Sequence, residues 1–223
     1  MKILNEKRIK IAIDSPAAAG AGTVAKKICK HYNLLYLDTG KIYRYLAYQK
    51  IKNPKIFSHN FIKNSVKNLK ASDLFKKNLI KDEIGVEASK IAKDKIIRKL
   101  VHKFQFDLAY NPPKKFNGSC LDGRDITYKI IPDADFKFFI TADIKIRAKR
   151  RFKELKAINK YVKYDDVLKS IKKRDKNDYN RKISPLKKTK DSVLINTTNL
   201  TKRACFLKIK KIIDKKLNRH GSI

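Results

Sequence analysis

The residues best placed to do chemistry lie between Ser15 and Thr23. A proline followed by small residues and two glycines cannot lie inside a strand or a helix, so it indicates a tight loop that another molecule can approach closely. In such a loop the backbone N–H groups and the N-terminus of a following helix face an anion, and a threonine hydroxyl can reach a metal ion. The sequence predicts a phosphate-binding loop, with Thr23 as candidate metal ligand, made of Ser15, Pro16, Ala17, Ala18, Ala19, Gly20, Ala21, Gly22 and Thr23.

This loop departs from the P-loop pattern G-x-x-x-x-G-K-[ST]. Ser15 replaces the first glycine, and Ala21 stands where the pattern has lysine. On this stretch alone, a strand-to-helix turn without a ligand explains the residues about as well as a nucleotide site does.

Two further polar clusters follow short apolar runs. Asp-Thr-Gly at 38–40 comes directly after residues 33–37, and Arg44 lies one helical turn beyond it. Asp-Gly-Arg-Asp at 122–125 follows residues 119–121, and three charges around a glycine are too costly to bury for packing to explain them. Open α/β sheets bind ligands at the carboxyl ends of strands, where both clusters would lie. The first cluster could also simply cap the next helix.

The elements that would position these clusters alternate along the chain. Apolar runs predict strands at 9–13, 33–37, 119–121, 136–141 and 192–197, and helical periodicity predicts helices between them. This alternation predicts an α/β fold with a parallel sheet covered on both faces. We expect Thr39 to N-cap a helix at 41–47. Residues 52–105 have a different character, rich in Lys and Asn, and indicate an inserted subdomain with a small core of its own.

The composition indicates one large domain, or one domain with an insert. Hydrophobic residues make up 42% of the 223 residues, and no run approaches the roughly 18 apolar residues of a membrane span. The start has no apolar signal segment, and the three cysteines form no C-x-x-C pair, so we expect a cytoplasmic protein with reduced thiols. The formal charge of +35 fits a polyanion partner, but the evenly spread lysines favour a general compositional bias instead.

In order and spacing, the motifs resemble those of the bacterial cytidylate (CMP) kinase family, from about Ile9 to Leu217. They include Ile-Asp-x-Pro-Ala with Gly-x-Gly-Thr, Tyr-Leu-Asp-Thr-Gly-x-x-Tyr-Arg, and Ser89 with Arg98 and Gln105. They continue with Asp-Gly-Arg-Asp-Ile, Pro-Asp-Ala-Asp-Phe-Lys-Phe-Phe-Ile-Thr-Ala, Arg-Ala-Lys-Arg-Arg and Arg-Asp-x-x-Asp-x-x-Arg-x-x-x-Pro-Leu. Eight of the eleven arginines lie in these motifs. A fork-shaped guanidinium suits phosphate recognition better than lysine does.

The resemblance implies a P-loop kinase with a five-stranded parallel sheet sandwiched by helices. The implied core is 1–50 and 106–223, with a lid at about 147–180 and an insert at about 51–105 that binds a nucleoside monophosphate. The implied activity is transfer of the γ-phosphoryl of ATP to CMP or dCMP, giving CDP or dCDP and ADP, with Mg²⁺. The implied protein is a monomer with no dedicated nucleic-acid partner and no membrane partner.

Residue roles are implied by the same resemblance. Ser89 and Arg98 would contact the cytosine and the phosphate side of the acceptor. The acceptor nucleotide would contact Asp38, Thr39, Arg44, Ser89, Arg98, Arg124, Asp125, Asp178 and Arg181. The lid that closes on ATP and covers the transferred charge would supply Arg147, Arg150 and Arg151.

The departures from the family pattern leave alternatives open. Ala21 lacks the ammonium that bridges the β- and γ-phosphates, Phe106 stands where the family has Arg, and Thr-Tyr-Lys at 127–129 replaces Gly-Thr-Val. Either another cation, such as Lys26, Lys27 or a lid arginine, supplies the missing charge, or the protein binds nucleotides with little catalysis. We favour the first account, because the acceptor residues are intact. A basic nucleic-acid-binding protein is the less favoured third alternative.

Overall fold

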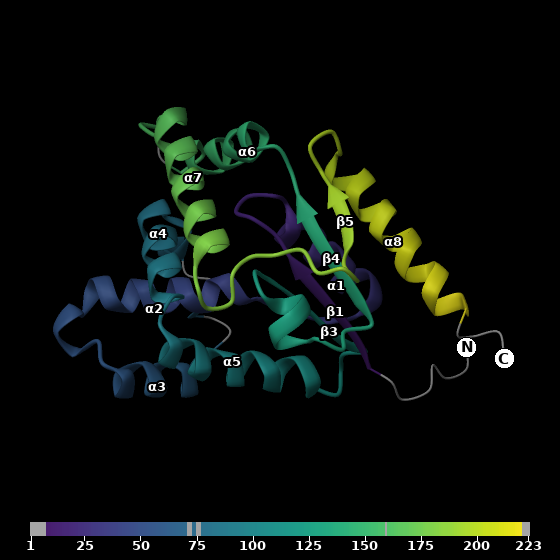
Figure 1. Cartoon of the computed structure of the whole chain (residues 1–223), viewed down its shortest axis with the longest axis horizontal. Helices are drawn as coiled ribbons and strands as arrows, with labels where there is room; N and C mark the ends of the chain where they lie inside the picture. The colour runs from purple at the N-terminus through teal and green to yellow at the C-terminus, as the bar shows by residue number, and fades with distance from the viewer. Residues whose placement is uncertain (1–7, 71–72, 75–76, 159, 220–223) are drawn as a thin grey trace.

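The computed structural model describes residues 8–70, 73–74, 77–158 and 160–219. The predicted core range is therefore described from residue 8, and the predicted insert is described without 71–72 and 75–76. A five-stranded sheet forms the centre of the molecule (Figure 1). Its strands are β1 (Ile9–Asp14), β2 (Leu35–Asp38), β3 (Gly118–Gly123), β4 (Phe136–Thr141) and β5 (Val193–Asn196).

All strand pairs are parallel, and the strand order is β2-β3-β1-β4-β5. The register aligns the carboxyl ends: Asp14 is opposite Gly123, and Asp38 is opposite Asp122. The parallel α/β fold and the five strands predicted from the sequence are confirmed. The polar clusters that follow β1, β2 and β3 consequently meet at one edge of the sheet.

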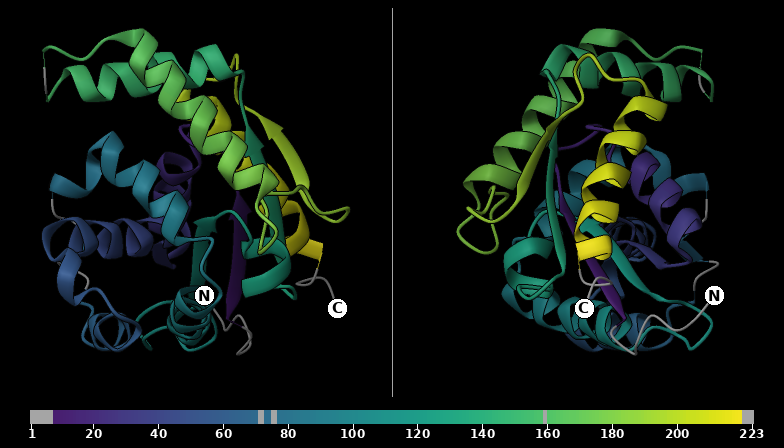
Figure 2. Two further views of the ribbon diagram at one scale, coloured as in Figure 1. Left: turned by 60° about the vertical axis from the view of Figure 1, so that its left-hand side comes forward. Right: turned by 90° about the vertical axis from the view of Figure 1, so that its right-hand side faces the viewer.

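Helices cover both faces of the sheet, as its buried parallel strands require. Ile11 and Ile13 pack in one apolar cluster with α1 (Ala21–Tyr32) and α8 (Lys202–Arg219). Ala12, between them in the strand, points to the other face and packs with α2 (Thr39–Lys52) and α5 (Lys95–Tyr110). In the right-hand view of Figure 2, α8 lies in front of the strands.

The predicted insert contains η1 (Pro54–Ile56), α3 (His59–Lys67), η3 (Lys77–Ile80) and α4 (Asp82–Ile91). The expected small core of its own is wrong. Ile62 and Ile84 belong to the same apolar cluster as Leu121 of the sheet, because α2 and α5 carry that cluster outwards from β3.

The helical hairpin of α6 (Ile144–Lys156) and α7 (Tyr164–Asn180) lies beyond the carboxyl ends of the strands (Figures 1 and 2). It has a small apolar cluster, in which Ala148 meets Val167 and Ile171. α7 also packs against α4 of the predicted insert. Three separate parts of the chain therefore surround the edge of the sheet that carries the polar clusters.

Candidate functional site

The loop between β1 and α1 has the backbone of an anion cradle. Ala18 and Gly20 have positive φ angles of 60° and 92°, so the chain turns sharply before α1 begins at Ala21. Gly20 caps α1 without a side-chain hydrogen bond, and no acidic residue lies in the first turn. Neither the cap nor the first turn of α1 therefore supplies a carboxylate to the amides at the positive end of the helix dipole.

Asp14, at the end of β1, connects the start of this loop by hydrogen bonds to the segment that follows β3. Its buried carboxylate accepts hydrogen bonds from the backbone N–H groups of Ile126 (2.8 Å) and Thr127 (2.9 Å) and from the Thr127 hydroxyl (2.6 Å). Burial raises the pKa of Asp14 to about 6, although these hydrogen bonds oppose the shift. η4 (Ile126–Ile130), a π-helix, follows directly. Thr127, one of the departures from the family pattern, therefore supports the floor of the site.

Two adjoining cavities lie at this edge of the sheet. The first has a volume of about 610 Å³ and is lined by the entire loop from Ser15 to Thr23, together with Asp38, Asp122, Arg150 and Arg151. The second, of about 70 Å³, is lined by most of the predicted acceptor contacts: Thr39, Arg44, Ser89, Arg98, Arg124, Asp125, Asp178 and Arg181. Arg44, Arg124 and Arg174 line both cavities.

The second cavity is built from buried ion pairs. Arg98 Nη1 lies 2.7 Å from Asp125 Oδ2, and its Nε donates to Ala92 O at 2.6 Å. Arg124 Nε donates to Asp178 Oδ2 at 2.7 Å. Burial opposes the ionisation of Asp178, but Arg124 and Arg181 outweigh it and hold the pKa of that carboxyl below its usual range. One nitrogen of Arg181, Nη2, is buried without a hydrogen-bond partner.

The wall shared by the two cavities is strongly cationic. Arg44 donates only to backbone oxygens, those of Leu79 (2.6 Å) and Lys81 (3.0 Å), among the contacts of the described residues. Burial, with Arg174 and Arg151 nearby, lowers the pKa of Arg44 to about 9. Arg174 has a buried Nε with no partner, and burial followed by the charge of Arg124 lowers its pKa. Such a wall is short of negative charge and would be stabilised by an anion.

Arg174 was not among the predicted contacts. The signal was present in the sequence, since Arg174 opens the Arg-Asp-x-x-Asp-x-x-Arg motif that ends at Arg181. The prediction for Thr39 was wrong in its local role. α2 is capped by Asp38 without a side-chain hydrogen bond, and the Thr39 hydroxyl donates instead to Asp122 O at 2.8 Å, because β2 and β3 end side by side.

The three predicted lid arginines lie in different surroundings. Arg147 lines neither of the two cavities: it donates to Ala142 O (2.9 Å) and Ala17 O (3.1 Å) and pairs with Asp175 at 2.7 Å. Arg150 lines the first cavity, and its hydrogen bonds within the described residues go to neutral groups: Nη1 lies 2.9 Å from Thr197 Oγ1, and Nη2 lies 2.7 Å from Thr197 O. Arg151 also lines the first cavity, and it pairs with Asp82 and Glu154.

The carboxylates of Asp38 and Asp122, at the ends of β2 and β3, line the first cavity together with Thr23. Asp122 accepts a hydrogen bond from Tyr36 at 3.1 Å, and burial followed by the charge of Asp38 raises its pKa well above the usual value. Within the described ranges no group of three or more His, Cys, Asp or Glu residues could hold a metal ion.

Comparisons with known proteins identify the family. A model of the family described as cytidylate kinase matches residues 11–215. The chain belongs to the cytidylate kinase family. Among relatives, the cytidylate kinase of Bartonella tribocorum is 40% identical over 94% of this chain and 96% of its own length, and that of Clostridium tetani is 39% identical over 93% and 94%.

More distant members of the cytidylate kinase family show the same coverage. The cytidylate kinase of Mesomycoplasma hyopneumoniae is 34% identical over 96% of both chains. A solved structure, an uncharacterized protein from Eubacterium ventriosum, aligns with a TM-score of 0.54 at 21% identity, covering 92% of this chain and 98% of its own, which supports the fold alone. Of the helices in the described residues, none is long and apolar enough to cross a membrane.

Proposed function

We propose that this chain transfers the γ-phosphoryl group of ATP to CMP or dCMP, giving CDP or dCDP and ADP. As a member of the cytidylate kinase family it is an ATP-dependent phosphotransferase. The observation that carries the proposal is the shared wall: Arg44, Arg124 and Arg174 face both the cavity of the phosphate loop and the cavity of the predicted acceptor residues. Donor and acceptor phosphates would meet against these three guanidinium groups.

On the donor side, the loop Ser15–Thr23 would wrap the ATP phosphates with its backbone N–H groups. Phosphoryl transfer depends on positioning and on neutralising charge rather than on a covalent protein group. Arg150 and Arg151, which line this cavity, would cover the charge that develops on the transferred group. Arg147 would act differently, by holding Ala17 and with it the shape of the loop.

On the acceptor side, the predicted contacts divide by chemistry. Ser89 and Arg98 would contact the cytosine and the phosphate side, while Asp38 and Thr39 would hold the nucleotide at the end of β2. Arg124, Asp125, Asp178 and Arg181 would contact its sugar and phosphate. The unpartnered nitrogens of Arg174 and Arg181 support this arrangement, because a phosphate would satisfy them.

Mg²⁺ would be bound mainly by the ATP phosphates and water, with Thr23 as the protein ligand. The pair of carboxylates at Asp38 and Asp122 fits such an ion, because burial and then the charge of Asp38 raise the pKa of Asp122, and a nearby cation would oppose both effects. Oxygen ligands of this kind suit Mg²⁺. The bound ion would neutralise part of the negative charge of the ATP phosphates.

Arg150 is our candidate for the charge that Ala21 does not supply. Lys26 and Lys27 are exposed and do not line the described cavities. Arg150 Nη1 lies 3.8 Å from the place that a Cβ on Gly20 would occupy, so its charge is next to the loop. No carboxylate of the described residues bonds to Arg150, and its charge remains available to a phosphate.

The remaining expectations belong to the same proposal. The chain would work as a cytoplasmic monomer with a core at 1–50 and 106–223, an insert at about 51–105 and a lid at about 147–180. Nucleotide binding without catalysis is not favoured, because the donor cavity contains cations besides the missing lysine. A dedicated nucleic-acid partner is not favoured either.

A coupled ADP-release assay with ATP and Mg²⁺ tests the proposal. Each of CMP, dCMP, UMP and AMP is supplied as acceptor, at concentrations from well below to well above KM. We expect kcat/KM to be highest with CMP or dCMP. Binding of CMP and ATP without ADP release would favour the non-catalytic alternative, and the absence of both binding and turnover would refute the proposal.

A further inference from the structure

The segment 79–82, at the end of η3 and the start of α4, contacts two arginines that line the cavities. The backbone oxygens of Leu79 and Lys81 accept hydrogen bonds from Arg44 Nη1. Arg151 donates to Ile80 O and, through Nε (3.0 Å) and Nη2 (2.9 Å), to Asp82 Oδ1. Four consecutive residues of the predicted insert therefore contact one arginine of α2 and one arginine of α6.

The surroundings of the Asp82–Arg151 ion pair favour a strong electrostatic attraction between the two side chains. The side chains are only 22% and 10% exposed, so solvent and salt screen their attraction less than at an open surface. Two nitrogens of the guanidinium share one carboxylate oxygen, which fixes the plane of the group. Asp82 is also in the first turn of α4, where a negative charge stabilises the helix.

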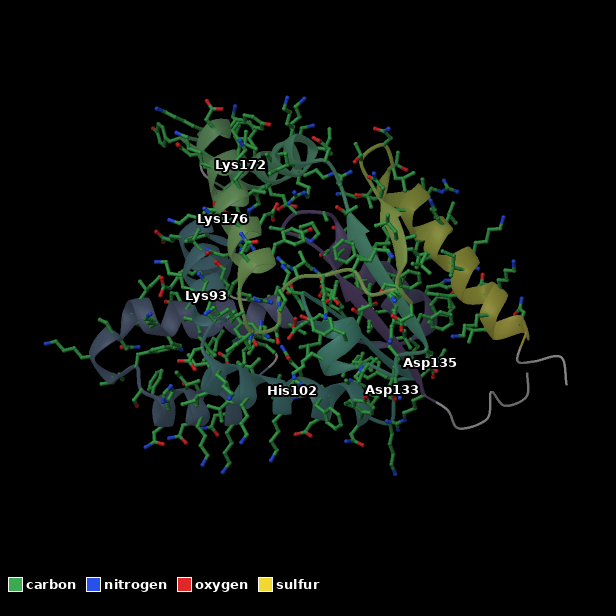
Figure 3. The ribbon with its side chains drawn as sticks, viewed as in Figure 1. Lys93, His102, Asp133, Asp135, Lys172 and Lys176 are labelled. Atoms are coloured by element: carbon green, nitrogen blue, oxygen red, sulfur yellow. The ribbon has the colours of Figure 1, made fainter. Side chains whose placement is uncertain are left out.

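A second contact joins the same two parts of the chain. Asn177 of α7 donates to Ser89 Oγ at 3.4 Å and accepts from Lys93 Nζ at 3.1 Å. Figure 3 shows Lys93 beside α4 and Lys176, the neighbour of Asn177, on α7. Neither of these contacts is an ion pair, whereas Asp82–Arg151 is an ion pair that joins α4 to the α6–α7 hairpin in the described residues.

We propose that the Asp82–Arg151 pair couples the two cavities, so that acceptor binding strengthens donor binding. The inference rests on the proposed function. The pair forms only while the segment 79–82 and α6 are both in place. An acceptor phosphate that holds Arg44 also holds the segment 79–82, which keeps Asp82 in position for Arg151. A donor phosphate that holds Arg151 acts on the same pair from the other side.

This coupling has a thermodynamic definition. The coupling factor is the Kd of a non-hydrolysable ATP analogue without CMP, divided by its Kd with saturating CMP. Linkage requires that the analogue change the affinity for CMP by the same factor, which provides an internal check. We expect a factor of about 5 to 150 for the native protein, the range typical of coupled sites. Asp82 is then a positioning residue that acts through Arg151.

The test compares Asp82→Asn with Glu83→Gln by calorimetry, using CMP and the imido analogue of ATP with Mg²⁺. Both variants remove one carboxylate from the first turn of α4, but Glu83 is 66% exposed and its contact with Lys81 is long, at 3.8 Å. We expect the coupling factor to fall to within about 2-fold of unity in Asp82→Asn, since the Asn177 contacts that remain between the two parts contain no ion pair and do not involve Arg151. We expect Glu83→Gln to keep the native factor, and CMP alone to bind both variants, which reports that they are folded.

Arg151→Lys gives a second route if Asp82→Asn does not fold. Lysine keeps the positive charge but cannot place two nitrogens on one carboxylate oxygen, so the factor should again fall. A native coupling factor of unity, or a factor unchanged in Asp82→Asn, would overturn the inference while leaving the proposed function intact. Failure of the native protein to bind either nucleotide would overturn both.

Discussion

Ala21→Lys restores the residue that the P-loop pattern requires and tests where the catalytic charge now comes from. Ala21 lines the first cavity, of about 610 Å³, but it is only 4% exposed and belongs to the apolar cluster of β1, α1 and α8, so a lysine there must extend out of this packing to place its ammonium in the cavity. Its ammonium would join a cavity that already contains the guanidinium groups of Arg150 and Arg151. The substitution therefore has opposite effects without and with nucleotide.

Without nucleotide, the added charge should destabilise the fold. Two like charges 4–8 Å apart interact by about 2–4 kcal/mol at an effective dielectric constant near 20, and movement of the flexible lysine leaves a net loss of roughly 1 kcal/mol. For a chain of this size, that lowers Tm by about 2–4 °C. Saturating ATP with Mg²⁺ should remove most of the difference, because the phosphates screen the lysine from the arginines.

With nucleotide, the gain in rate depends on whether a cation is missing. One well-placed donor at a charged transition state contributes about 10²–10³ in kcat. If no other group supplied that charge, Ala21→Lys should raise kcat by this factor. Because Arg150 lies against the loop with no carboxylate partner among the described residues, we expect a gain below about 10-fold instead.

The assay is ADP release at saturating ATP and CMP, in a cycle of four proteins: native, Ala21→Lys, Arg150→Met and the double variant. We expect Arg150→Met to lower kcat by about 10²-fold in the native background and by much less beside Lys at 21. Lys27→Met, which removes an exposed cation from the same region, is the matched control and should leave kcat unchanged. A gain of 100-fold in Ala21→Lys, or a native rate in Arg150→Met, would refute the assignment of this charge to Arg150.

Two substitutions test the floor of the site. Thr127→Ala removes the hydroxyl that stabilises the ionised form of Asp14, so the pKa of Asp14 should rise further above about 6. Urea denaturation should show that the free energy of unfolding falls by about 1.5–3 kcal/mol at pH 8, and that this loss largely disappears at pH 5, where Asp14 is protonated. Equal losses at both pH values would contradict this explanation. Gly123→Ala would place a Cβ 2.4 Å from the Thr39 hydroxyl oxygen, and we expect a loss of about 1–3 kcal/mol and of turnover. The control Gly40→Ala, whose nearest contact would be 3.3 Å, should cost clearly less; equal losses would contradict the steric argument.

The sheet and the first cavity could be predicted because their signals are local. Ile9, Ile11 and Ile13 form one short β-branched run, and the glycines and proline after them cannot continue that strand. Each polar cluster directly follows an apolar run, so parallel strand topology is enough to bring the clusters together. The prediction that the clusters come together did not require the order of the strands, because the carboxyl ends of all five strands lie on one edge of the sheet.

The parts that could not be predicted depend on contacts between distant segments. Asp82 and Arg151 are 69 positions apart, and neither spacing nor composition indicates that they pair. The role of Thr39 was mistaken for the same reason. A threonine at the start of a helix is usually a cap that accepts from a backbone N–H, but here the Thr39 hydroxyl donates to the Asp122 carbonyl oxygen at the neighbouring end of β3.

The distribution of acids within the site explains how the family's chemistry can persist without the loop lysine. The chain has 56 Lys and Arg against 21 Asp and Glu, yet buried carboxylates pair with the arginines that shape the site, as Asp125 does with Arg98 and Asp178 with Arg124. Among the described contacts, Arg44, Arg150 and Arg174 have no such hydrogen-bonded carboxylate. The charge left unbalanced therefore lies where the two cavities and the loop meet, and replacing one lysine by alanine removes one of several cations there rather than the only one.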